Sequence, residues 1–313
     1  MSAIGIVIVT YNSQAQIGGC LDAALATGAE LVVVDNASVD GTIAEIARRG
    51  VRLIANSYNR GFAGAVNQGF AVLNTTYVLL LNPDTVIQSS LEPLREACDL
   101  PGAAAAGGCL LDADGHPQIG FMVRNLPTPA AMALEALLLN RLWPNNQVNR
   151  WYRGLGLDYS ARQTVGQPAG AFLMVRRQVW QELGGFDERF FPLWFEDVDF
   201  CRRATDRGYR LYYVPQAIAK HTGAHSMVSL TVEKRRLYWY GSFLRYSAKH
   251  FHRSAYRGVC LAVITGSFLR MIFESALHRS LKPIAVYGKV VRLTSRWLFR
   301  GGGDGVMQSG LKA

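Results

Sequence analysis

The sequence of 313 residues lacks the features that mark several large classes of protein. Its five cysteines are an odd number without a C-x-x-C pair, which argues against a disulfide framework and a zinc knuckle. No basic segment or cleavage site precedes the strand-like residues Ile4 to Val9, so we expect no secretory signal. The cysteine pattern favours a reducing compartment. The length and apolar content predict one large or two fused units with a proper core.

The common nucleotide-binding turns are also missing. The first predicted strand is followed by Thr10-Tyr11-Asn12-Ser13-Gln14, which contains neither the G-x-G-x-x-G turn nor the P-loop. Hydride transfer and ATP hydrolysis therefore lose their main support. The loop from Asn59 to Gly69 is the remaining glycine-containing candidate, because Gly61 and Gly64 permit close approach of backbone to a ligand.

Acidic residues are scarce near the carboxyl terminus. Residues 231–300 hold 14 Lys and Arg against 2 acids, a net charge of +12, whereas residues 1–230 hold 18 against 20. This block predicts an anionic partner surface, either phospholipid or nucleic acid, and a solvated basic helical face is the alternative. No basic stripe interleaved with aromatic residues is present, so we expect no nucleic-acid partner.

Strand-like and helix-like segments alternate along the chain. The first strands are expected at 4–9, 31–34, 51–55 and 77–81, with helices between them at 15–26, 42–48 and 63–73. Further along, we expect strands at 170–176 and 209–214, and helices at 178–183 and 196–207. Consecutive βα units predict an α/β fold with a mostly parallel sheet.

Two segments depart from this alternation. Residues 124–167 contain three prolines and an amphipathic run at 130–143, and they read as an insertion over the ligand edge of the sheet; a helix packed on the core is the equal alternative. The glycine-rich end, 301–313, is expected to be a disordered tail.

Two aspartates close runs of uncharged strand residues. Asp35 follows Leu31 to Val34, and Asp84 ends the turn Asn82-Pro83-Asp84 after another such run. Ligands of open α/β sheets bind outside the carboxyl ends of the strands, so these acids suggest a sugar, a ribose or a metal-bound phosphate. Asp84 is a candidate ligand for Mg²⁺ or Mn²⁺ bridging a diphosphate, and a turn-capping aspartate is the alternative.

A third group of acids lies at the start of a predicted helix. Glu196, Asp197 and Asp199 stand among apolar residues, which raise the basicity of a carboxylate and favour general-base catalysis; helix capping is the structural alternative. His221 and His225 follow the last predicted strand in a glycine-containing loop and are candidate ligands.

Taken together in their order along the chain, the motifs over residues 4–226 resemble those of glycosyltransferase family 2, the inverting enzymes of the GT-A fold. Within that family the chain looks most similar to the rhamnosyltransferase-like branch, which uses deoxyhexose nucleotides and lipid-linked or polysaccharide acceptors. The family's usual D-x-D pair appears here as Asn82-Pro83-Asp84. The resemblance rests on the segments 7–13, 34–42, 59–69, 82–84, 170–172, 184–187 and 196–197.

The resemblance implies a role for each matching residue. Asp197, with Glu196 beside it, would supply the catalytic base, and Trp194 would offer an aromatic face to the acceptor. Asp84 and His221 would hold a divalent metal, Mg²⁺ or Mn²⁺, on the diphosphate of a UDP- or dTDP-linked sugar. The implied donor-binding residues are Thr10, Tyr11, Asn12, Asp35, Asn59, Gly61, Asn67, Asn82, Gly170 and Ala171.

The resemblance also suggests how the chain is organised. Residues 1–226 would form the GT-A catalytic domain, with 124–167 on the acceptor side, and residues 227–300 a basic, amphipathic, helical membrane-associating region. The apolar run Val259 to Phe273 is shorter than the roughly 20 residues of a spanning helix and carries Arg270, so we expect an interfacial helix. The protein would then sit peripherally on the inner face of the cell membrane, beside a polyprenyl-diphosphate acceptor.

Two other functions compete with glycosyl transfer. A nucleotidyltransferase would share the sheet and the metal-binding acid, but it needs a basic or glycine-rich triphosphate turn after the first strand. A non-catalytic binding protein would use the α/β domain as a scaffold behind the basic region.

Overall fold

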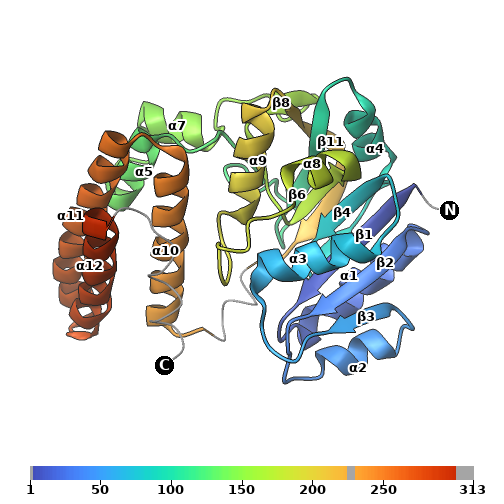
Figure 1. Ribbon diagram of the computed structural model, residues 1–313, viewed down its shortest axis with the longest axis horizontal. Helices are drawn as coiled ribbons and strands as arrows, with labels where there is room; N and C mark the ends of the chain where they lie inside the picture. The colour runs from blue at the N-terminus through green and yellow to red at the C-terminus, as the bar shows by residue number, and fades with distance from the viewer. Residues whose placement is uncertain (1–2, 224–229, 301–313) are drawn as a thin grey trace. The chain divides into compact units, whose positions relative to one another are not determined.

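The structure is a computed structural model that describes residues 3–223 and 230–300, so the expected tail at 301–313 lies outside the described residues (Figure 1). The described chain divides into two compact units. The first contains residues 3–126, 153–192 and 196–223, and the second contains 127–152, 193–195 and 230–300. The expected insertion at 124–167 is therefore divided between the two units.

A nine-stranded sheet forms the centre of the first unit, in the order β3-β2-β1-β4-β10-β6-β11-β5, with β8 also paired to β11. The strands that share one direction are β1 (Ile4–Thr10), β2 (Glu30–Asp35), β3 (Arg52–Ala55), β4 (Tyr77–Leu81), β6 (Ala103–Leu111) and β11 (Arg210–His221). Antiparallel to their neighbours are β5 (Thr85–Ile87), β8 (Gln163–Val165) and β10 (Phe172–Arg176). The predicted mostly parallel α/β sheet is confirmed.

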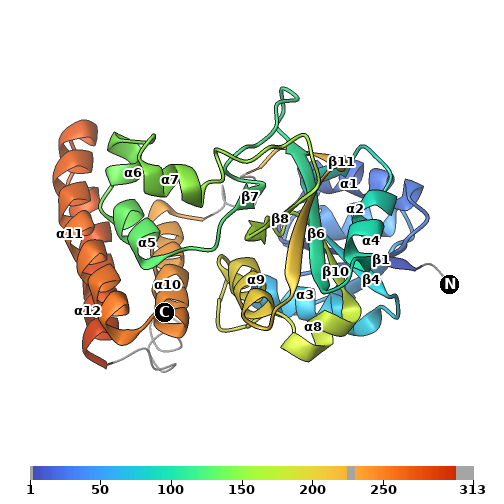
Figure 2. The same cartoon turned by 90° about the horizontal axis from the view of Figure 1, so that it is seen from above.

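Helices cover both faces of this sheet (Figure 2). One apolar cluster joins the sheet to α1 (Gln14–Ala26), α2 (Thr42–Ala47) and α4 (Glu92–Asp99). The other joins it to α3 (Gly61–Val72), α8 (Arg177–Leu183) and α9 (Glu196–Asp206). All of β4 is buried, with Leu79 in the first cluster and Leu80 in the second, as expected of a central strand covered on both faces.

The elements expected over the first 81 residues are confirmed to within two residues of each boundary. The last strand is longer than expected. It was predicted to end at Val214, but pairing with β6 resumes at Ile218 after an irregularity, and β11 continues to His221. His221 therefore belongs to the strand itself and is paired with Thr85 of β5.

A small sheet completes the first unit. It pairs β7 (Val123–Arg124) with β9 (Gln167–Pro168) in the antiparallel sense. β9 lies shortly before β10 in the chain. Its pairing with β7 therefore joins the residues before β10 to those that follow β6.

The second unit is helical. Its members are α5 (Pro129–Ala136), α6 (Leu139–Leu142), α7 (Gln147–Tyr152), α10 (Val232–His250), α11 (Arg253–His278) and α12 (Lys282–Arg300). Figure 1 shows α10, α11 and α12 alongside one another. The buried Arg270 of α11 donates hydrogen bonds to the carbonyl oxygens of Glu135, at 3.2 Å, and of Ala136, which joins α11 to α5.

The helix that carries the apolar run is longer than the run itself. The run spans Val259 to Phe273, whereas α11 extends over 26 residues to His278. By length and composition alone, α11 is able to cross a membrane, a test that the core helices of soluble proteins also pass.

Close packing of α3 on β1 leads to a stability prediction. A Cβ atom at Gly69 would lie 2.4 Å from Cγ1 of Val7, a stiff and fully buried side chain. We expect Gly69→Ala to lower the free energy of unfolding by about 1–3 kcal/mol, measured by urea denaturation. The control is Gly19→Ala on α1, where the nearest atom would lie at an ordinary 3.7 Å, and equal loss in both variants would contradict the packing argument.

Candidate active site

One edge of the sheet collects most of the predicted site residues. The strands β1, β2, β4 and β11 share a direction, and their carboxyl ends are Thr10, Asp35, Leu81 and His221. The antiparallel strand β10 begins at this edge, where the Asn82 amide donates a hydrogen bond to the Ala171 carbonyl at 3.0 Å. Polar residues at these strand ends therefore lie along the edge where open α/β sheets bind ligands.

The first cluster at this edge is organised by Asp35, which is completely buried. Its Oδ1 accepts hydrogen bonds from the hydroxyls of Thr10, at 2.7 Å, and Ser38, at 2.5 Å, and its Oδ2 accepts one from the Ser38 amide at 2.8 Å. Asp35 thus ties the end of β1 to the loop after β2. Its contact with a nucleoside stays a prediction.

The neighbouring loop is held by the same serine. The Asn12 amide donates to Ser38 Oγ at 2.8 Å, and Asn12 Oδ1 accepts from the Val39 amide at 2.9 Å. Asn12 has a φ of 51°, in the left-handed region that asparagine tolerates better than most residues. The half-buried Tyr11 lies between these anchored positions. Ser38 was given no role from sequence, although it falls within a recognised motif.

The loop that enters α3 is held by asparagine side chains. Asn59 Oδ1 accepts the Gly61 amide at 2.8 Å, and Gly61 has a φ of 78° with no room for a Cβ, which would lie 2.8 Å from the Phe191 ring. Asn67 bonds both backbone groups of Phe186 at 3.0 Å. The Asn59 contact holds the loop, and the Asn67 contacts join α3 to the segment at Phe186. Donor binding by Asn59, Gly61 and Asn67 stays a prediction.

Asp84, in the turn after β4, lies close to His221 at the end of β11. Nε2 of His221 lies 3.6 Å from Oδ1 of Asp84, and their side chains are only 7% and 10% exposed. Burial lowers the pKa of His221, an effect that the Asp84 charge partly offsets, so the neutral ring is favoured at neutral pH. A neutral imidazole nitrogen and a carboxylate oxygen this close together fit a divalent metal ion as shared ligands. His225 lies outside the described residues.

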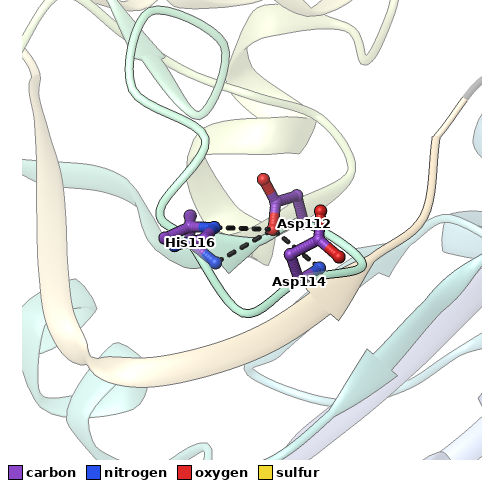
Figure 3. Close-up of side chains that lie close together, drawn as sticks. All are labelled: Asp112, Asp114 and His116. Carbon is purple, nitrogen blue, oxygen red and sulfur yellow. Dashed lines mark hydrogen bonds and ion pairs between the residues drawn. The ribbon is translucent and has the colours of Figure 1, made fainter.

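A second group of possible ligands lies in the turn after β6 (Figure 3). Asp112, Asp114 and His116 place one ligand atom each within 4.8 Å of one another. Oδ1 of Asp112, however, accepts the backbone amides of Asp114 and His116, both at 2.9 Å, so it stabilises its own turn. Asp114 and His116 are exposed, and nothing else about this turn points to a ligand.

The acids at the start of α9 have different environments. Asp197 Oδ2 accepts the Gly170 amide at 3.0 Å and the Gln167 side chain at 3.1 Å, while Oδ1 accepts the Val198 amide at 2.8 Å. Burial raises the pKa of Asp197, against the opposing effect of the Gly170 and Val198 amides. This carboxylate is held in place and made more basic, as a general base requires.

The two flanking acids have other partners. Glu196 is buried, its Oε2 has no hydrogen-bond partner among the described residues, and burial followed by the charge of Asp197 raises its pKa well above the ordinary value. Asp199 is fully buried and paired with Arg203 at 2.7 Å, which also donates to the Leu183 and Gly185 carbonyls. Asp199 is therefore occupied by a structural ion pair.

Short hydrogen-bonded links join the turn 82–84 to Asp197. Asn82 bonds Ala171, and the preceding residue, Gly170, bonds Asp197. Sequence reasoning identified these four residues but missed Gln167, as well as Arg124, whose positive charge acts on Asp197. Both lie on the small β7–β9 sheet, and two-residue strands leave no periodic signal in a sequence.

Trp194 groups with the second unit. Residues 193–195 pack there, with the Phe195 ring 5.5–6.5 Å from the rings of Trp239, Phe243 and Tyr246 on α10. Trp194 is half-buried and has a φ of 76°, an unusual conformation for a large side chain. Its contact with an acceptor stays a prediction.

Comparison with known proteins identifies the class to which this fold and site belong. The model of the family described as "Glycosyl transferase family 2" matches residues 5–182, and that of "Glycosyl transferase family group 2" matches residues 142–297. The chain belongs to glycosyltransferase family 2 and is a glycosyltransferase.

Its relatives include rhamnosyltransferases. The N-acetylglucosaminyl-diphospho-decaprenol L-rhamnosyltransferase of Mycobacterium tuberculosis is 33% identical over 71% of this chain and 76% of that protein. Rhamnosyltransferase WbbL of Escherichia coli K12 is 26% identical over 61% of this chain and 69% of that protein. The resemblance to the rhamnosyltransferase branch is confirmed.

Solved structures share the fold. A mannosyltransferase from Pyrobaculum calidifontis, in complex with GDP-Man and Mn²⁺, has a TM-score of 0.53 at 16% identity, over 95% of this chain and 83% of that chain. GalNAc-T7 with UDP, GalNAc and Mn²⁺ has a TM-score of 0.52 at 14% identity, over 79% of this chain and 51% of that chain. The predicted GT-A-like fold is confirmed.

The raised pKa of Glu196 leads to a pH prediction. A carboxyl group whose pKa is higher in the folded than in the unfolded protein stabilises the fold at low pH, and this contribution is lost as pH rises. Glu196→Gln removes that loss, so the Tm of the variant relative to that of the wild type should rise as the pH is raised above the ordinary pKa of a glutamate. If the Tm values of the two proteins changed with pH in parallel, the raised pKa of Glu196 would be contradicted.

Proposed function

We propose that the protein is an inverting glycosyltransferase that moves a sugar, L-rhamnose, from a dTDP- or UDP-linked donor to a hydroxyl of a lipid-linked or polysaccharide acceptor in cell-envelope glycan synthesis. Family membership and the names of the relatives support the reaction and the sugar. The observation that carries the proposal is Asp197, a half-buried residue whose carboxylate has a raised pKa and is held by Gly170 and Gln167.

The proposed reaction is a single displacement at the anomeric carbon. Asp197 removes the proton of the acceptor hydroxyl, whose oxygen forms the new glycosidic bond while the bond to the nucleoside diphosphate breaks. The hydroxyl attacks from the face opposite the leaving group, so the configuration inverts. The amides of Gly170 and Val198 orient the carboxylate, and burial keeps it basic.

Asp84 and His221 are the residues that would hold a divalent metal ion, whose charge offsets that of the departing diphosphate when it is bound. The turn presents one carboxylate, because Asn82 stands where the family has a first aspartate. The backbone of Asn82 is occupied as well, since its amide bonds Ala171 and its carbonyl accepts the Thr85 amide at 3.1 Å.

Replacing the base tests the mechanism directly. We expect Asp197→Asn to bind donor with unchanged affinity and to lower kcat by about 10²- to 10⁴-fold, because asparagine keeps the shape but accepts no proton. Donor binding is measured by calorimetry, and transfer by release of nucleoside diphosphate from a panel of UDP-, dTDP- and GDP-sugars.

A matched control lies on the same helix. Asp206 pairs with Arg202 at 2.8 Å near the end of α9 and is half exposed, so Asp206→Asn should keep normal turnover. Near-normal kcat in Asp197→Asn would refute the assignment of the base. Absence of transfer from every donor of the panel would refute the proposed function.

We also propose that the protein binds peripherally to the inner face of the cell membrane, through α11. One side of α11 is packed against its own unit, while its other side exposes large apolar residues, including Ile272 (69%) and Leu277 (72%). The exposed apolar set on this helix is Leu261, Phe268, Leu269, Ile272, Phe273 and Leu277. An anionic bilayer is the proposed occupant of this apolar face.

Charge complementarity supports that occupant. Exposed basic residues flank the apolar face, with Arg257 near the start of α11 and Arg279 and Lys282 just beyond its end. Arg270 lies in the middle of the helix but is turned inward onto the α5 carbonyls, so it leaves the exposed face apolar. Apolar side chains bordered by cations suit the boundary between acyl chains and anionic headgroups.

Vesicle binding tests the apolar face. We expect Phe268→Ser/Ile272→Ser/Phe273→Ser to lower sedimentation with phosphatidylglycerol vesicles at least about tenfold, because burial of one such side chain is already worth about 1.5–3 kcal/mol. The control is Leu25→Ser, which removes a 42% exposed leucine from α1. Unchanged sedimentation of the triple variant would refute this surface.

A further inference from the structure

Gln118 lies in the segment between β6 and β7, just beyond the turn 112–116, and its backbone is held by hydrogen bonds. Its amide donates to the Leu110 carbonyl at 2.8 Å, and its carbonyl accepts the amides of Phe121 and Met122, both at 3.0 Å. These backbone hydrogen bonds hold the Gln118 side chain at a defined position beside the end of β11.

The side-chain amide of Gln118 makes two contacts with one residue, His221. Gln118 Nε2 donates to the backbone carbonyl of His221 at 2.7 Å, and Gln118 Oε1 lies 3.0 Å from His221 Nδ1. One side chain thus contacts both the backbone and the ring of a proposed metal ligand. The two residues are 103 positions apart in the chain.

These contacts determine the proton position on the imidazole ring. A carbonyl oxygen only accepts hydrogen bonds, so the amide group facing the His221 carbonyl must be the NH₂ of Gln118. The Gln118 oxygen then faces Nδ1, and it also only accepts, so Nδ1 carries the hydrogen. In the neutral ring this leaves Nε2 with its lone pair.

That lone pair is on the nitrogen that faces Asp84, in the turn 82–84. Nε2 lies 3.6 Å from Asp84 Oδ1, beyond the length of a hydrogen bond. Two electron-pair donors that face each other at this distance are an unfavourable pair alone and a favourable one around a cation. The Phe121 ring is stacked on the imidazole, with centroids 5.2 Å apart and planes inclined by 7°, which restricts rotation of the His221 ring.

We propose that Gln118 is a positioning residue for the metal site: it holds His221 in the Nδ1–H tautomer and thereby presents Nε2, together with Asp84, to the divalent ion. The inference rests on the proposed function, in which Asp84 and His221 would hold a divalent metal ion. It adds a residue outside the motifs that define the site, and it makes the segment around Gln118, between β6 and β7, part of that site.

Metal affinity separates positioning from simple packing. We expect Gln118→Leu to lower Mn²⁺ affinity about 10- to 100-fold, the usual loss when the outer partner of a ligating histidine is removed. Gln118→Glu should retain near-wild-type affinity, because a carboxylate still accepts the Nδ1 hydrogen. A purely structural role predicts the opposite order, since a carboxylate beside the His221 carbonyl disturbs packing more than leucine does.

The measurement uses the full chain with Mn²⁺ and either UDP or dTDP, and it follows the electron paramagnetic resonance of the free ion. Gln88→Leu is the control, because Gln88 is an exposed glutamine next to β5. A second readout needs no metal: ¹⁵N-histidine spectra of the apo chain should show a protonated Nδ1 and a bare Nε2 for His221, whose signal is identified with His221→Asn.

Several results would overturn the inference. They are a protonated Nε2 on His221 in the apo chain, wild-type Mn²⁺ affinity in Gln118→Leu, or no Mn²⁺ binding by the wild type. The last result together with glycosyl transfer in the presence of a chelator would leave the proposed function standing. Intact Mn²⁺ binding without transfer from any donor would refute the proposed function, but not the role of Gln118 in metal binding.

Discussion

The antiparallel pairing of β10 with β4 is the constraint on which the site depends. It places Ala171 against Asn82, so the turn that carries Asp84 lies beside the segment that leads into β10. The next residue back, Gly170, offers its amide to Asp197. A strand of opposite direction inserted into a parallel sheet thus brings its amino end to the edge where the other strands have their carboxyl ends. Without that reversal, Asp197 and the turn that carries Asp84 would not share these backbone links.

The three acids of α9 show how environment separates residues that look alike in sequence. Asp199 is neutralised by Arg203, and Glu196 is buried with one oxygen unbonded. Asp197 is half-buried as a residue, burial raises the pKa of its carboxyl group, and its carboxylate accepts three hydrogen bonds. Only this combination suits a group that must meet a substrate hydroxyl and take up its proton. The same contrast holds at the strand ends, where Asp35 organises loops and Asp84 faces a histidine nitrogen.

The residues differ in how far sequence could predict them. Strands such as Tyr77–Leu81 are uninterrupted runs of strand-forming residues, so their positions and the acids that follow could be found. β6 begins with four alanines and two glycines, which carry no strand preference, and it was not predicted. The contacts of Gln118 with His221 and of Gln167 with Asp197 join residues far apart in the chain, and one sequence holds no signal for them. The grouping of residues 193–195 with α10 depends on tertiary packing in the same way.

The central claim is that this chain transfers a sugar with inversion, using Asp197 as the base. The most direct test is the anomeric configuration of the product, determined by nuclear magnetic resonance after transfer from dTDP-rhamnose, or from whichever donor of the panel is used. The account predicts a glycosidic bond whose configuration is opposite to that of the donor. A product that retains the donor configuration would contradict it.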